Sequence, residues 1–219
     1  MSDDAGDFIP ALRFKALTRH FDTVLSHTLK EEQFRSLLLD QAGIEPGHRV
    51  VDIGCGTGTL AVMLKRRVPE AEVIALDPDG DALAIARKKA ADAGVDVDFR
   101  QTLAWAADIE DGSVDRVLSS LVLHHLTAPA KRRSLERARK WLRPGGELHI
   151  ADWGKAQNWL MRAAFLGVQL LDGFETTREK VRVGLVPCIQ EAGLGGVEET
   201  HREQTLFGTL SLYRGSLRP

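Results

Sequence analysis

The sequence predicts an α/β protein with a mostly parallel sheet, and two patterns along its 219 residues support this fold class. From Arg49 to Ala151, short segments of strand character alternate with helical segments of about 10 to 15 residues, as in parallel sheets covered by helices on both faces. Two further strand-like segments, Val197–His201 and Leu206–Tyr213, follow one another without a helix between them. Because such a pair is typical of an antiparallel edge, we expect the last strand to be antiparallel.

Two helices are predicted before the first strand. Apolar residues recur at helical spacing over residues 10–29, and again from Glu31 to Gly43, where a glycine is expected to end the helix. We expect residues 1–45 to form an N-terminal helical cap over the site and residues 46–219 to form the main part of the same structural domain.

The remaining elements follow in alternation. Strands are expected at Val50–Ile53, Val73–Leu76, Val97–Arg100, Val114–Ser120 and Leu148–Ala151. Helices are expected from the glycine-rich loop to Pro69, from Asp79 to Gly94, over Pro129–Leu142 and over Arg178–Ala192. The tetrapeptide Arg143–Gly146, which reads Arg-Pro-Gly-Gly, predicts a turn before the fifth strand.

Composition excludes several classes of protein. A hydrophobic fraction of 43% beside 27% charged residues is ordinary for a globular domain, and a net charge of -2 argues against a generally basic nucleic-acid binder. Cys55 and Cys188 offer no disulfide framework and too few ligands for a structural zinc site, and no other pattern requires a metal. The acidic start MSDDAGDF lacks the features of a signal peptide, so a cytoplasmic location is expected.

A glycine-rich loop follows the first strand. The stretch Arg49–Leu60 reads RVVDIGCGTGTL and carries glycine at every second position, Gly54, Gly56 and Gly58. Such glycines accept positive φ and let the backbone approach a ligand, while the first turn of the next helix offers free amides. Asp77 ends the second strand at the distance from the loop where a carboxylate can accept hydrogen bonds from ribose hydroxyls. The sequence therefore predicts a site for an adenosine-type cofactor.

Two cofactor classes fit this loop. The segment Gly56–Ala61 also satisfies the G-x-G-x-x-G/A pattern of a dinucleotide-binding turn, so a nicotinamide-dependent oxidoreductase is one alternative. Asp52 argues for the other class, because it places a carboxylate at the last inward position of the first strand. A carboxylate there can receive a cationic amine, whereas it would repel a pyrophosphate.

Four motifs together resemble the class I S-adenosylmethionine-dependent methyltransferases, in particular enzymes similar to the ubiquinone and menaquinone methyltransferases. They are VVDIGCGTG, VIALDPD, DGSVDRVLSSLVLHHL and LRPGGEL, in family order and with family spacing between Arg49 and Ile150. The resemblance implies a Rossmann-like three-layer sandwich with a seven-stranded sheet. It also implies transfer of a methyl group from S-adenosylmethionine to a nitrogen, oxygen or carbon nucleophile, with release of S-adenosylhomocysteine.

The resemblance assigns cofactor contacts to particular residues. Gly54, Gly56 and Gly58 would lie against the methionine portion and ribose, with Asp52 near the cationic amine. Asp77 and Pro78 would lie at the ribose hydroxyls, and the Ser119 region would meet the methionine amine.

The adenine contact departs from the family pattern. Where similar proteins commonly carry Gly-Asp-Ala, this sequence reads Thr102-Leu103-Ala104, so the usual side-chain acceptor is missing. Adenine could instead contact the backbone near Ala104 and stack on Trp105. Trp105 is interpreted equally well as a cover on the surface of the domain.

Candidate residues for catalysis and acceptor binding lie at the ends of the fourth and fifth strands. His124 or His125 could act as a general base, although for each histidine taken singly, closure of the loop by backbone hydrogen bonds is the slightly favoured interpretation. Asp152 and Trp153 could offer a carboxylate and an aromatic wall to the acceptor, or instead a helix cap beside a core tryptophan. His20 in the first helix is a weaker acceptor-binding candidate.

The apolar segment Trp159–Phe174, which includes Phe165, is too short to span a bilayer. We expect it to cover the sheet and part of the acceptor site, which favours an apolar or lipid-like acceptor, although core packing explains most of it.

The helix Lys131–Arg143 carries a run of cations. A solvated face is the ordinary interpretation, and peripheral contact with anionic lipid or with nucleic acid is the alternative. We predict a methyltransferase that acts on a small-molecule acceptor, with no nucleic-acid partner. A protein that binds S-adenosylmethionine without catalysis is a further alternative. No pattern identifies the acceptor or the oligomeric state.

Overall fold

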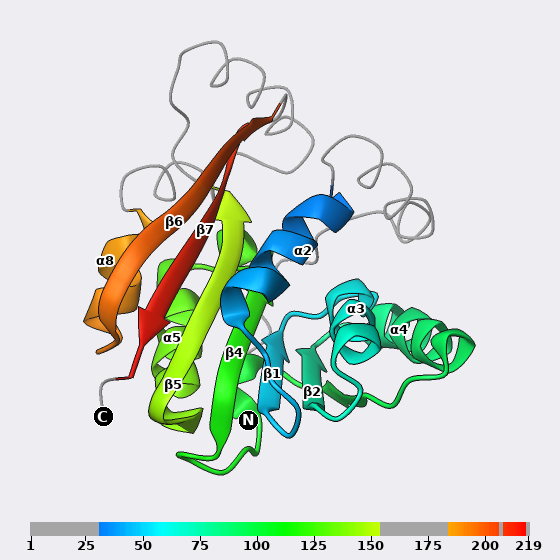
Figure 1. Ribbon diagram of the computed structural model, residues 1–219. Coiled ribbons are helices and arrows are strands. Elements are labelled where there is room, and N and C mark those ends of the chain that lie inside the picture. The colour runs from blue at the N-terminus through cyan, green and yellow to red at the C-terminus, as the bar shows by residue number, and fades with distance from the viewer. Residues whose placement is uncertain (1–30, 154–183, 206–207, 218–219) are drawn as a thin grey trace.

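The computed structural model describes residues 31–153, 184–205 and 208–217, which form a seven-stranded sheet with helices on both faces (Figure 1). The strands are β1 (Arg49–Ile53), β2 (Glu72–Asp77), β3 (Asp98–Gln101), β4 (Val114–Ser120), β5 (Leu142–Trp153), β6 (Gly195–Thr205) and β7 (Gly208–Ser216). Their order in the sheet is β3-β2-β1-β4-β5-β7-β6. The predicted α/β class and the seven-stranded sheet are confirmed.

The direction of the strands follows the prediction. Strands β1 to β5 are mutually parallel, whereas β7 is antiparallel to both β5 and β6. The chain first builds outward from β1 to β3 and then returns to place β4 beside β1, so the strand order reverses between β1 and β4. In open α/β sheets, ligands bind beyond the carboxyl ends of the strands at such a reversal.

Helices cover the two faces of the sheet and bury separate cores. The described helices are α2 (Glu31–Ala42), α3 (Thr59–Arg67), α4 (Gly80–Ala93), α5 (Ala128–Trp141) and α8 (Leu185–Glu191), with short 3₁₀ turns η2 (Ala104–Ala106) and η3 (Leu123–His125). On one face α2 and α3 pack around Leu38, Leu64 and Leu118, while on the other α5 and α8 pack around Trp141 and Ile189 (Figure 1). This arrangement is the expected three-layer sandwich.

Local signals in the sequence set the helix ends. The Asp79 side chain accepts hydrogen bonds from the amides of Asp81 (2.8 Å) and Ala82 (3.3 Å) at the start of α4, and Gly94 ends that helix at φ 65°. At the start of α5, Thr127 Oγ1 accepts from the Ala130 amide at 3.4 Å. Such caps satisfy amides and carbonyls that have no partner inside the helix.

The start of the fifth strand was predicted wrongly. The expected turn Arg143–Gly146 lies inside β5, which begins at Leu142, six residues before the predicted start at Leu148. Leu142 already pairs with Val114, and the next pair, Glu147 with Arg116, leaves the Pro-Gly-Gly residues as an irregularity in the strand. Turn-forming residues are also the residues that a β-bulge uses, so the local pattern did not distinguish the two.

Several predicted elements lie wholly or partly outside the described residues. They include the helix over residues 10–29 with His20, the segment Trp159–Phe174 with Phe165, and the part of the predicted last helix before residue 184. Both final strands exceed their predicted bounds, since β6 begins at Gly195 and β7 continues to Ser216. The division of the domain at residue 45 stays a prediction.

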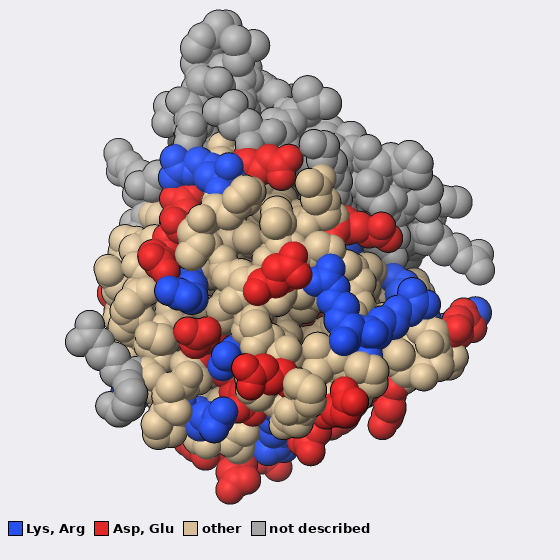
Figure 2. Space-filling view, in the orientation of Figure 1, with Lys and Arg blue, Asp and Glu red and all other residues tan. Residues whose placement is uncertain are grey.

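The surface carries both signs of charge. Lys and Arg side chains lie beside Asp and Glu side chains over most of the described face shown in Figure 2. Of the helices in the described ranges, none is both long and apolar enough to cross a bilayer.

Candidate active site

The glycine loop lies at the carboxyl ends of β1 and β2, where backbone hydrogen bonds hold it. The amides of Gly54 and Cys55 both donate to the Leu76 carbonyl, at 2.8 and 2.9 Å. Gly54 adopts φ 69°, and a Cβ placed there would lie 2.5 Å from a methyl group of Val122. Only glycine satisfies both conditions, because other residues disfavour positive φ and a contact this close is a clash.

The other two glycines of the loop differ in their surroundings. A Cβ at Gly58 would lie 2.8 Å from Ala86 Cβ, so the loop packs tightly on α4 at this point. A Cβ at Gly56 would meet no atom of the described residues within 4 Å, although φ there is 52°. Gly58 also begins α3 without a side-chain cap. The loop thus presents an open side at Gly56 next to a helix start whose first amides lack a cap, as backbone recognition of a cofactor requires.

Asp77 connects the loop to the end of β2. Its Oδ2 accepts from the Gly56 amide and its Oδ1 from the Asp79 amide, both at 2.8 Å. Burial raises the pKa of the Asp77 carboxyl, and these two amides only partly offset the shift. Each carboxylate oxygen can accept more than one hydrogen bond, so the group can still bind ribose hydroxyls.

Asp52 and Ser119 place buried polar atoms beside the loop. Both residues are only 1% exposed, and neither Asp52 Oδ2 nor Ser119 Oγ has a hydrogen-bond partner among the described residues. Burial raises the pKa of the Asp52 carboxyl to about 7, with Arg35 on α2 lowering it and Asp77 raising it further. Since buried polar atoms in proteins are nearly always paired, these two atoms fit a ligand with a cationic amine.

The segment after β3 lies next to Asp77. The Thr102 amide donates to the Asp77 carbonyl at 3.1 Å, and Ala104, 5% exposed, begins η2. The Trp105 ring packs against the core on the α5 side, and the Arg133 guanidinium lies 4.6 Å from its centroid. These contacts give Trp105 a packing role, whereas adenine contacts at Ala104 and Trp105 stay predictions.

A second polar group lies at the carboxyl ends of β4 and β5. Asp152 Oδ1 lies 2.6 Å from His124 Nδ1 and accepts from the Trp153 amide at 2.7 Å, while Asp152 Oδ2 accepts from the His124 amide at 3.1 Å. The rings of His124 and His125 lie 3.9 Å apart at their centroids. Trp153 is half-buried and packs on the α2 side of the sheet. Asp152 therefore joins η3 to β5 through the His124 amide and ring. Its alternative interpretation as a helix cap after β5 concerns residues outside the described ranges and stays a prediction.

The structure brings the predicted residues of the described part to one edge of the sheet. Sequence reasoning did not find Arg35, which acts on the buried Asp52 carboxyl, or Lys89. Lys89 on α4 donates to the hydroxyls of Thr57 and Thr59 in the glycine loop, at 3.2 and 2.6 Å. The sequence offered no signal for these residues, because their neighbours come from distant elements.

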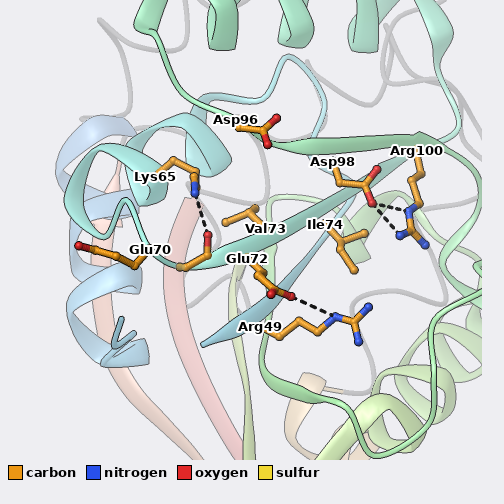
Figure 3. Close-up of a pocket in the computed structure, with 10 residues that line it drawn as sticks. Arg49, Lys65, Glu70, Glu72, Val73, Ile74, Asp96, Asp98 and Arg100 are labelled. Carbon is orange, nitrogen blue, oxygen red and sulfur yellow. Dashed lines mark hydrogen bonds and ion pairs between the residues drawn. The ribbon is translucent and has the colours of Figure 1, made fainter. Parts of the chain in front are cut away.

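A pocket of about 330 Å³ lies at the opposite edge, at the amino ends of β1, β2 and β3 (Figure 3). Both of its arginines are paired within the protein: Arg49 lies 3.9 Å from Glu72, and Arg100 lies 2.7 Å from Asp98. Because ligands of open α/β sheets bind at the carboxyl ends, this pocket is not the candidate site.

Comparison with known proteins identifies the family. The methyltransferase domain family matches residues 50–146. The chain is 30% identical over 166 residues to an uncharacterised methyltransferase of Synechocystis, a match that covers 74% of each chain. It is 35% identical over 121 residues to a demethylmenaquinone methyltransferase of Thermus thermophilus, covering 55% of this chain and 54% of that one. It is also 37% identical over 122 residues to a ribosomal RNA small subunit methyltransferase C of Pseudomonas aeruginosa, covering 52% and 35%.

The fold supports the same conclusion. A crystal structure of an S-adenosylmethionine-dependent methyltransferase from Aquifex aeolicus matches with a TM-score of 0.64 and 18% identity, covering 94% of this chain and 100% of that one. The architecture is thus that of the Rossmann-like α/β proteins. Within that class, the chain belongs to the S-adenosylmethionine-dependent methyltransferase family. The alternative of a nicotinamide-dependent oxidoreductase is not favoured. The chain spans about half or less of the Thermus and Pseudomonas relatives.

Proposed function

We propose that the protein transfers a methyl group from S-adenosylmethionine, bound on the glycine loop, to a small-molecule acceptor over the carboxyl ends of β4 and β5. The observation that carries the proposal is the arrangement of Asp77 and Gly56. The Asp77 carboxylate fixes the Gly56 amide at 2.8 Å, and the position beside Gly56 is open. A cofactor can therefore contact loop backbone and ribose-binding carboxylate together.

The residues at this edge would each have a defined task. Gly54 and Gly58 hold the loop in shape, Gly56 leaves space for the cofactor, and Asp77, with Pro78 beside it, would bind the ribose. Asp52 and Ser119 would receive the amine of the methionine portion, because they hold the buried polar atoms without partners. The cofactor supplies an electrophilic methyl group, and the protein has to position the acceptor and exclude water.

A small acceptor is supported by charge as well as by one relative. The Thermus relative is named for a quinone, whereas the Pseudomonas relative is named for ribosomal RNA. Three cations of α5, which would be the natural contact for a polyanion, have partners within the protein. Arg137 pairs with Asp111, Arg132 with Glu136, and Arg139 donates to the Gly193 carbonyl. These pairs favour a small molecule over RNA, and contact with anionic lipid stays a prediction.

The test is the affinity of an Asp77→Asn variant for S-adenosylhomocysteine, measured by calorimetric titration. Hydrogen bonds to a charged group contribute about 1.5–3 kcal/mol, so the affinity should fall roughly 10- to 100-fold. Asp92→Asn is the matched control, because Asp92 lies exposed on α4 in an ion pair with Lys88 and should change nothing. An unchanged affinity of Asp77→Asn would contradict the assignment. A second assay follows the transfer of labelled methyl groups from S-adenosylmethionine to compounds in a cell extract. Transfer shows catalysis, whereas its absence would indicate a protein that only binds the cofactor.

A further inference from the structure

A buried carboxylate and a partly exposed imidazole lie in contact at the ends of β4 and β5. The Asp152 side chain is 1% exposed and the His124 side chain 27% exposed, and their nearest atoms, Oδ1 and Nδ1, are 2.6 Å apart. The short distance means that a proton lies between these two atoms.

The charge of Asp152 decides where the protons of His124 reside. Burial by itself would raise the pKa of the Asp152 carboxyl, but the charge and hydrogen bond of His124, together with the Trp153 amide, outweigh burial and hold that pKa below its ordinary value. Asp152 is therefore ionised at neutral pH and acts only as an acceptor. Neutral His124 must then carry its proton on Nδ1, which leaves the lone pair on Nε2.

The surroundings of His124 leave that lone pair available. Within the described ranges, the hydrogen bond of the His124 ring is made by Nδ1, to Asp152, and Nε2 has no hydrogen-bond partner. The His125 ring lies tilted beside the His124 ring, with centroids 3.9 Å apart. The other titratable groups that interact with the pair are His125 on η3 and Tyr213 on β7.

We propose that Asp152 and His124 form a general-base pair that removes a proton from a hydroxyl group of the methyl acceptor. This inference rests on the proposed function. The O–H bond of the acceptor breaks, its electrons stay on oxygen, and the proton joins Nε2 of His124 to give an imidazolium beside the Asp152 carboxylate. His124 is the catalytic residue, and Asp152 is a positioning residue that fixes the tautomer and stabilises the imidazolium.

The inference narrows the class of acceptor. An amine that is neutral at physiological pH already has a lone pair for methyl transfer and needs no base. A phenol or enol is a poor nucleophile until it loses its proton, after which oxygen or the adjacent ring carbon can attack. We therefore assign the acceptor to hydroxyl-bearing compounds of the phenol or enol type.

Asp152 also accepts two backbone amides, so a purely structural role predicts different results from the proposed one. The first test uses the protein without cofactor. Two-bond ¹⁵N–¹H NMR spectra of histidine-labelled protein, assigned with His124→Gln, should show neutral His124 with its proton on Nδ1. In Asp152→Asn the proton should move to Nε2. A wild-type His124 protonated on Nε2 would overturn the proposal.

The second test compares probe acceptors with labelled S-adenosylmethionine. Catechol and naphthohydroquinone need a base, whereas thiophenol is largely ionised at neutral pH. In His124→Gln the rate on the hydroxyl probes should fall about 10²- to 10⁴-fold, while thiophenol methylation changes little. Asp152→Asn should show the same split, and His201→Gln, at an exposed position of β6, is the matched control.

The possible failures are distinguishable. If both probe types lose rate equally in His124→Gln, or neither does, the base is elsewhere and the inference is wrong. If wild type binds S-adenosylhomocysteine but methylates neither hydroxyl probe, the assigned acceptor class is wrong while the proposed function stands. If wild type does not bind S-adenosylhomocysteine at all, the proposed function itself has failed.

Discussion

The ends of β1 and β2 and the ends of β4 and β5 lie at the same edge of one sheet, yet they are built in different ways. At β1 and β2 the site consists mainly of backbone, with positive φ at Gly54, Gly56 and Gly58 and amides that face Asp77. At β4 and β5 it consists of side chains, above all the contact of Asp152 with His124.

This difference determines what each region tolerates. A backbone-built region depends on glycine, because any Cβ changes the main-chain conformation or fills the space for the ligand. A side-chain-built region can keep its fold while its chemistry changes, since a substitution such as Asp152→Asn retains size. We therefore expect stability and cofactor affinity to respond at the first region, and rate and acceptor choice at the second.

The largest expected effect is on folding, at Gly54. Gly54→Ala forces alanine to φ 69° and brings its Cβ to 2.5 Å from Val122. Left-handed strain and overpacking each cost about 1–3 kcal/mol, so the free energy of unfolding should fall by roughly 3–4 kcal/mol. Urea denaturation measures this loss.

Gly56→Ala is the matched control for that variant. Its φ of 52° carries the same conformational strain, but no atom of the described residues lies within 4 Å of the new Cβ. Stability should fall by only about 1–2 kcal/mol. Affinity for S-adenosylhomocysteine should fall about tenfold or more, because the Cβ would occupy the open side of the loop. Equal stability losses in the two variants would contradict the comparison.

His149 on β5 contrasts with His124, because its ring is fully buried and fully hydrogen-bonded. It is completely buried, with Nδ1 3.0 Å from Gln41 Nε2 and Nε2 3.2 Å from Glu147 Oε2, so both nitrogens are engaged. Burial, together with Arg116 and Arg214, lowers its pKa to about 3. As pH falls below the ordinary histidine value of 6.5, the unfolded chain binds a proton that the folded protein rejects, and stability declines down to about pH 3.

The measurement compares wild type with His149→Gln in urea at pH 7 and at pH 5. The decline amounts to about 1.4 kcal/mol per pH unit, so wild type should lose about 2 kcal/mol more than the variant between these conditions. If wild type and variant lose the same free energy of unfolding, His149 is protonated in the folded protein at pH 5. The contrast between a buried, fully paired His149 and a partly exposed His124 would then be wrong.

Asp52 gives the smallest expected effect, on proton uptake. Its pKa of about 7 lies above the ordinary value of 3.8. The free protein therefore loses stability as pH rises from 3.8 to about 7, and this carboxyl causes no further loss above that pH. A cationic amine beside the carboxylate would lower that pKa, so cofactor binding near pH 7 should release part of a proton. Affinity for S-adenosylhomocysteine should rise about tenfold from pH 6 to pH 8.

Calorimetry in buffers of different ionisation enthalpy measures the released protons. Asp52→Asn should remove this release, and it should also flatten the dependence of affinity on pH. If the variant releases the same number of protons as wild type, the amine of the cofactor does not lie beside Asp52. The assignment of cofactor binding to the ends of β1 and β2 would then be weakened.

Most of the fold and the backbone-built half of the site could be predicted from the sequence, because they depend on local patterns. Alternation of apolar segments predicted the strands, and glycine spacing predicted a loop in which Gly54, Gly56 and Gly58 all adopt positive φ. The error at Leu142 had the same local origin, since Pro-Gly-Gly is equally suited to a turn and to an irregular strand.

The side-chain-built half could be predicted only as separate candidates. His124 and Asp152 were both named from their positions at strand ends, but their contact depends on the register of β4 against β5, which the irregularity near Arg143 shifts. Gln41 and His149 are 108 residues apart, and no local pattern connects them. Such pairs form only when the sheet is assembled.

The position of β7 has a consequence for assembly. Trp153 of β5 pairs with Leu210 of β7, so one edge of β5 can only be completed by a segment far along the chain. Until β7 inserts, that long edge has unpaired amides and carbonyls, which invites pairing with other chains. We expect the β5 amides that face β7 to gain protection late in pulse-labelled refolding, after β1 and β2, so that the half of the sheet nearest the acceptor forms last.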